Sequence, residues 1–124
     1  MPKTVAVPDI TMVRKPKIKL LKNEKIAVSK LKESLIEKFK LFDFRVFGSK
    51  VRGNASSDSD IDVMIEIEDY NPSVESAIDD IVFEINLNFD CFISTIIFSK
   101  KEIEEGPLSE SPIYKLIQKE GVRV

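Results

Sequence analysis

The spacing of apolar residues predicts a helix followed by a strand in the first half of the chain. From about Asn23, apolar side chains recur three or four positions apart with lysine and glutamate between them; they are Val28, Leu31, Leu35 and Phe39. This spacing places them on one face of a helix, and Asn23 can cap its start. Residues 41–47 are rich in aromatic and β-branched side chains and run into Gly48, which favours a strand.

A second strand and a second helix follow a polar loop at residues 53–59. Apolar side chains at Ile61, Val63, Ile65 and Ile67 alternate with Asp60, Asp62, Met64 and Glu66. This period of two indicates a strand with one apolar face. Asn71 and Pro72 then begin a helix, because proline is favoured at the first helical position. Its apolar stripe consists of Val74, Ile78, Ile81 and Ile85.

The rest of the chain predicts a third strand and a closing helix. The strand spans roughly residues 90–98, and the helix spans residues 112–119 and is stopped by Gly121. The expected order is helix, strand, short loop or turn, strand, helix, strand, helix. This order predicts an α/β fold of the α+β type, a small mixed sheet flanked by helices.

Length and composition are those of one small globular domain. The chain has 124 residues, 43% of them hydrophobic, which is enough for one core. Residues 1–22, interrupted by three prolines, are expected to form an N-terminal arm, either flexible or a short edge strand. Residues 23–124 are expected to form a single domain. The apolar runs are too short to span a bilayer, and the single cysteine, Cys91, leaves no internal disulfide. We therefore expect a cytoplasmic protein without a membrane segment.

Charge and the absence of histidine narrow the possible chemistry. Residues 1–40 carry eleven Lys/Arg against four Asp/Glu, yet the whole chain has a net charge of −2. A strongly basic domain, typical of nucleic-acid binding, is not seen, so nucleic acid is not expected as a direct substrate. Without histidine, serine–histidine triads and imidazole zinc sites are excluded. Any metal must be held by oxygen, which favours Mg²⁺, Mn²⁺ or Ca²⁺, and the first two are expected here.

The candidate chemistry lies in the segment FGSKVRGNASSDSDIDVMI, residues 47–65. Gly48 ends a strand where a ligand's phosphate could approach the backbone closely. Ser49 offers a hydroxyl and an N–H to phosphate oxygens, and Lys50 and Arg52 could neutralise phosphate charge.

Two carboxylates begin the next strand, ten residues beyond the glycine–serine pair. Asp60 and Asp62, at positions i and i+2, project from the same face of a strand, about 6.5–7 Å apart along the backbone. Divalent cations bind such carboxylates together with the phosphate oxygens of a substrate. The combination predicts a site for a phosphate-bearing ligand and a divalent metal.

This arrangement of GS, ten residues and DxD resembles the DNA polymerase β-like nucleotidyltransferase superfamily. The short chain and RGNASSDSDIDVMIEI in particular look like the minimal nucleotidyltransferases, the antitoxin-type partners of HEPN ribonuclease toxins. The resemblance covers roughly residues 30–98 and implies the polymerase β-like fold. It does not extend to residues 1–22.

The resemblance also implies roles for individual residues. Gly48 and Ser49 would bind the triphosphate, and Asp60 and Asp62 would hold the metal. A third carboxylate is expected on the following strand, where Asp90 matches, completes the metal cluster and could take the proton of the acceptor. Glu66 is its competitor, since it shares a face with the aspartate pair but lies further along the strand.

The resemblance implies a reaction and a partner as well. The expected function is transfer of a nucleoside monophosphate, AMP from ATP, to a hydroxyl of a HEPN-type toxin, which would neutralise that toxin. One alternative is a non-catalytic antitoxin that inhibits its partner by contact. Another is a nucleotidyltransferase that acts on a small molecule.

Overall fold

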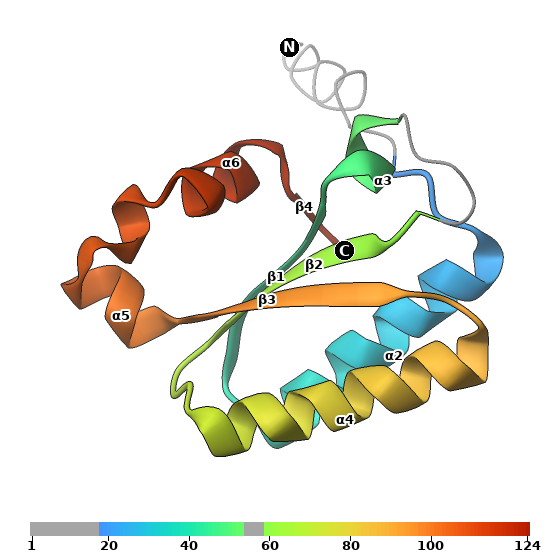
Figure 1. The fold of residues 1–124 in the computed structure, drawn as a ribbon, viewed down its shortest axis with the longest axis horizontal. Coiled ribbons are helices and arrows are strands. Elements are labelled where there is room, and N and C mark those ends of the chain that lie inside the picture. The colour runs from blue at the N-terminus through green and yellow to red at the C-terminus, as the bar shows by residue number, and fades with distance from the viewer. Residues whose placement is uncertain (1–17, 54–58) are drawn as a thin grey trace, which may run out of the picture.

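The computed structural model describes residues 18–53 and 59–124 (Figure 1). Their elements, in order, are α2 (Lys22–Lys38), β1 (Leu41–Phe47), α3 (Ser49–Arg52), β2 (Ile61–Ile67), α4 (Pro72–Phe89), β3 (Ile93–Ser99), α5 (Lys100–Glu105), η2 (Pro107–Glu110), α6 (Pro112–Glu120) and β4 (Val122–Arg123). The expected small mixed sheet with flanking helices is confirmed.

The sheet has the strand order β3-β2-β1-β4. Strand β1 runs antiparallel to both β2 and β4, whereas β2 and β3 are parallel because the long helix α4 connects them. The end of β1 and the starts of β2 and β3 therefore meet at one end of the sheet, where α3 also lies (Figure 1).

Helices α2 and α4 cover one face of the sheet side by side (Figure 1). The alternating apolar residues of β2 point into this layer, with Ile61, Val63 and Ile65 fully buried. They pack against the helix residues that the spacing picked out, among them Leu31, Leu35 and Ile78. Complete burial of one such side chain contributes about 1.5–3 kcal/mol, so this layer supplies most of the apolar stabilisation.

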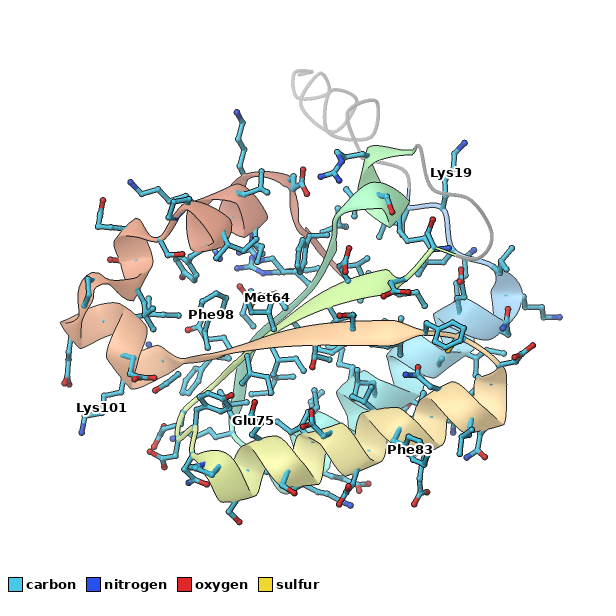
Figure 2. The ribbon with its side chains drawn as sticks, viewed as in Figure 1. Lys19, Met64, Glu75, Phe83, Phe98 and Lys101 are labelled. Carbon is cyan, nitrogen blue, oxygen red and sulfur yellow. The ribbon has the colours of Figure 1, made fainter. Side chains whose placement is uncertain are left out.

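The opposite face is only partly covered, by α5, η2 and α6. Met64, Phe98 and Ile117 form a second, smaller core there, and Figure 2 shows Met64 and Phe98 on the side of the sheet that faces these elements. The Phe98 and Tyr114 rings pack edge to face, with centroids 5.2 Å apart. Most of this cover lies toward the far ends of β2 and β3, and the end of α6 reaches the turn at Gly48.

Several local expectations are corrected by the structure. Strand β3 begins at Ile93 and not at residue 90, because Asp90 ends α4 in a left-handed conformation with φ 52°. Asn23 does not cap α2. Leu21 is the N-cap, and the Asn23 side chain donates a hydrogen bond to the Phe89 carbonyl at 2.6 Å. Most of the polar loop, residues 54–58, and most of the proposed arm, residues 1–17, lie outside the described residues.

Within the described ranges, no helix is both long and apolar enough to cross a membrane.

Candidate functional site

Gly48 joins the two motifs of the sequence in space. Its φ of +80° lies in the left-handed region, and a Cβ placed on it would lie 2.3 Å from Oδ2 of Asp62. Only glycine avoids both the strain and the collision. The backbone of the glycine–serine turn therefore packs directly against one carboxylate of the aspartate pair.

Asp60 and Asp62 occupy the open face at the start of β2. Asp62 stands opposite Phe47, the last residue of β1, and is half-buried, while Asp60 is exposed. Burial and the negative charge of Asp60 raise the pKa of Asp62, and the Arg52 guanidinium opposes that rise. Burial is the larger cause and repulsion by Asp60 the smaller one, and a bound cation would offset both.

Ser49 begins α3 directly after Gly48 and is partly exposed. The turn is closed by hydrogen bonds from the Val51 and Arg52 N–H groups to the Gly48 carbonyl, at 3.0 and 3.1 Å. Gly48, Ser49 and Asp62 thus lie together at this end of the sheet.

The Lys50 side chain points toward Glu24 of α2. Its side chain is buried at 1% exposure and forms an ion pair of 3.1 Å with Glu24 of α2, which is equally buried. An ammonium held in this way ties α3 to α2. The ion pair gives Lys50 a structural role, and phosphate binding by Lys50 stays a prediction.

Arg52 remains available to the site. Half of its side chain is exposed, its charge reaches Asp62, and its guanidinium contacts Glu120 at the end of α6 at 3.1 Å. Glu120 was not among the residues that the sequence singled out. Nothing in the local pattern marks it, because its partners lie about seventy positions earlier in the chain.

On strand β3, the residue beside Asp62 is Ser94 and not a carboxylate. The parallel register pairs Asp62 with Ser94 and Ile61 with Ile93. Phe92, just before the strand, accepts a hydrogen bond from Ile61 at its carbonyl, and its ring is 65% exposed. The alternation of buried and exposed residues places Phe92 and Ser94 on the face of the aspartate pair.

Asp90 is not brought to the aspartate pair. It caps α4 and lines a cavity of about 420 Å³ with Ser59 and Phe92. Among the residues that the structure describes, no three acidic or cysteine side chains lie close enough to hold a metal together. The expected cluster of Asp60, Asp62 and Asp90 is thus reduced to two carboxylates.

Comparison with known proteins agrees with this geometry. The nucleotidyltransferase domain family matches residues 28–119, which is most of the chain and includes the turn and the aspartate pair. The chain belongs to this family.

A solved structure supports the assignment at the level of the fold. It is described as that of a proposed minimal nucleotidyltransferase, and it superposes with a TM-score of 0.55 at 16% sequence identity. The match covers 81% of this chain and 91% of that one. No curated protein matches the sequence.

The nucleotidyltransferase domain offers a suitable environment for a divalent metal. Asp60 and Asp62 are oxygen ligands of the kind that Mg²⁺ prefers, and one or two carboxylates plus substrate phosphates are its usual set. These two residues would hold the ion.

Glu66 does not serve as the third ligand. It pairs with Asp43 on β1, near the cover formed by α6, and burial together with the Asp43 charge raises its pKa. Asp43 itself is held by Arg45 at 2.9 Å and Arg123 at 3.0 Å. Glu66 therefore belongs to a polar cluster that links β1 to the end of the chain.

Proposed function

We propose that this nucleotidyltransferase domain transfers AMP from ATP to a hydroxyl group of a partner protein. The observation that carries the proposal is the contact of Gly48 with Asp62, because it combines a phosphate-binding turn with a pair of metal-binding carboxylates. Catalysis of this kind depends on positioning and charge neutralisation more than on covalent chemistry.

Each residue of the site has a distinct role in the proposal. Ser49 holds the triphosphate through its hydroxyl and N–H, and Arg52 adds positive charge beside it. Asp60 and Asp62 hold the divalent ion, which would neutralise the charge on the phosphates.

The order of the strands suggests on which side of β2 pyrophosphate leaves and on which side the acceptor enters. Strand β2, with the aspartates, lies between β1, which carries the serine turn, and β3. In an in-line displacement, the bond from the α-phosphorus to pyrophosphate breaks as the bond to the acceptor oxygen forms on the opposite side. Pyrophosphate thus leaves on the β1 side, and the acceptor enters from the β3 side, past Phe92 and Ser94. The proton of its hydroxyl passes to solvent.

The partner in this proposal is a HEPN-type ribonuclease toxin, which AMP transfer would neutralise. Support comes from the resemblance of residues 52–67 to minimal nucleotidyltransferases and from the fold of the matched structure. The exposed Phe92 ring gives the acceptor side an apolar contact for a protein surface.

A second candidate is an antitoxin that inhibits its toxin by contact alone. Ser94 beside Asp62 and the remote position of Asp90 favour it, because the described part of the site lacks a third carboxylate. Mass spectrometry of a HEPN partner incubated with the domain, ATP and Mg²⁺ separates the two. AMP transfer adds one nucleotide mass that is absent with Asp62→Asn, whereas inhibition by contact leaves the partner's mass unchanged.

A further inference from the structure

The carboxylate of Glu120 joins the end of α6 to the phosphate-binding turn. Its Oε2 accepts a hydrogen bond from the Gly48 N–H at 3.0 Å. Nη1 of Arg52 donates to Oε2 at 3.1 Å and to Oε1 at 3.3 Å. One side chain therefore holds both the first residue of the turn and the arginine at its end.

The position of Glu120 is itself tightly fixed. The next residue, Gly121, packs so closely that a Cβ there would lie 2.6 Å from the Ile117 carbonyl oxygen. Beyond it, β4 pairs with β1, with Val122 opposite Val46. The Glu120 side chain is only 18% exposed, compared with 50% for Arg52.

Glu120 reaches the turn from the side opposite to the aspartates. Extension of the β1–β4 register by two residues places Glu120 opposite Gly48, on the β4 side of β1. Asp62 lies on the β2 side. A phosphate bound on the aspartates' side of the turn therefore does not need the space that the Glu120 carboxylate occupies.

Arg52 can contact both groups at once. A guanidinium carries five N–H donors, and among the described residues the Glu120 contacts use Nη1 alone. The Arg52 charge also acts on Asp62, so the guanidinium lies within electrostatic reach of the metal ligands. The remaining donors can face a triphosphate while Glu120 holds the arginine in place.

We propose that Glu120 is a positioning residue for nucleotide binding, which fixes the Gly48 turn and orients Arg52 toward the triphosphate. This inference rests on the proposed function of the site. It adds to the site a residue from the last helix of the fold. Glu120 touches neither the nucleotide nor the metal and acts through Gly48 and Arg52.

The test is the equilibrium dissociation constant of ATP in the presence of Mg²⁺, measured by calorimetry on folded protein. Glu120→Ala is expected to weaken binding about tenfold. Glu120→Gln keeps an acceptor for both partners and should restore binding to within about threefold of wild type. The double variant Glu120→Ala/Arg52→Ala should bind no more weakly than Arg52→Ala alone, because the two residues act as one unit.

The control is Glu110→Ala, which removes an exposed carboxylate that pairs with Lys115 in the same region of the chain. It should leave binding unchanged. Tighter binding by Glu120→Ala would show that the carboxylate competes with phosphate and would overturn the inference. An unchanged ATP dissociation constant for Glu120→Ala would overturn the inference as well. So would simply additive losses of affinity in the double variant Glu120→Ala/Arg52→Ala.

Failure of the proposed function has a different signature, since wild type would then bind no ATP at all with Mg²⁺. If Glu120→Ala does not fold, Glu120→Asp decides the question, because its shorter side chain cannot reach both Gly48 and Arg52. Binding several-fold weaker than that of Glu120→Gln is expected, and equal affinity of the two variants would overturn the inference.

Discussion

At the scale of single residues, the site depends on one close contact. Gly48 and Asp62 come from separate motifs, and the missing Cβ of the glycine is what allows the carboxylate to lie against the turn. The sequence predicts both motifs from residue type and spacing. It cannot predict that they touch, since that follows from the pairing of Phe47 with Asp62 across two strands.

Substitution of the two positive-φ glycines tests this contact. Gly48→Ala and Gly53→Ala both place a side chain at positive φ, at a cost of about 1–3 kcal/mol each, although only Gly53 lies in the αL region itself. Only Gly48→Ala also collides with Asp62, because nothing lies within 4 Å of a Cβ at Gly53. We expect Gly48→Ala to lose a further 1–3 kcal/mol, roughly, in urea unfolding and to lose ATP binding. Equal losses for both variants would show that the Asp62 contact is unimportant.

Asp62→Asn tests the repulsion between the paired carboxylates. A folded-state pKa above the unfolded value means that Asp62 costs stability once both states are ionised, at neutral pH. Without metal, Asp62→Asn should therefore melt at a higher temperature than wild type. This gain should disappear as the pH falls below about 4, where the carboxyl is protonated in both states. Thermal melts in EDTA across this pH range give the answer, and a variant less stable than wild type at pH 7 would contradict the account.

At the scale of elements, the long periodic segments were predictable and the short ones were not. Helices α2 and α4 and strands β1 and β2 follow from their apolar spacing. Elements such as β4, two residues long, carry too few positions to show a period. The start of β3 was misplaced because Asp90 and Cys91 adjoin a β-rich run, although Asp90 adopts a left-handed helix end.

The ion pair of Lys50 could not be predicted from the local sequence either, because its partner Glu24 lies on another helix. Lys50→Met leaves a buried carboxylate without this partner and should destabilise the fold by about 3–5 kcal/mol. The double variant Lys50→Met/Glu24→Gln should recover much of that loss. Chemical denaturation measures both. A stable Lys50→Met protein with strongly reduced ATP affinity would instead return Lys50 to the phosphate site.

A substitution on strand β3 can add the third carboxylate that the described part of the site lacks. Ser94→Asp would place a third acidic side chain beside Asp62. In EDTA the added repulsion should lower the melting temperature, and Mg²⁺ affinity should rise on the order of tenfold. Ser76→Asp, on the exposed side of α4, is the matched control and should change neither. Equal Mg²⁺ affinity for Ser94→Asp and wild type would place Ser94 away from the metal.

At the scale of the whole molecule, one face of the sheet holds the main core and the other holds the candidate site. One face is closed by α2 and α4 and carries most of the core, so it determines the fold. The other is covered by α5 and α6 mainly toward the far ends of β2 and β3, and the end of α6 reaches the Gly48 turn (Figure 1). The aspartates, Phe92 and Ser94 lie on the less covered part of this face. We therefore expect Asp60, Asp62 and Ser94 to be exchangeable without loss of the core.

The most direct test of the central claim follows the label of ATP into a HEPN partner protein. With Mg²⁺ and wild-type domain, label at the α-phosphate should become covalently attached to the partner, and label at the γ-phosphate should leave with pyrophosphate. Asp60→Asn and Asp62→Asn should each abolish the attachment while they retain the fold by circular dichroism. Attachment of γ-label, or α-label transfer that persists in either variant, would contradict nucleotidyl transfer at this site.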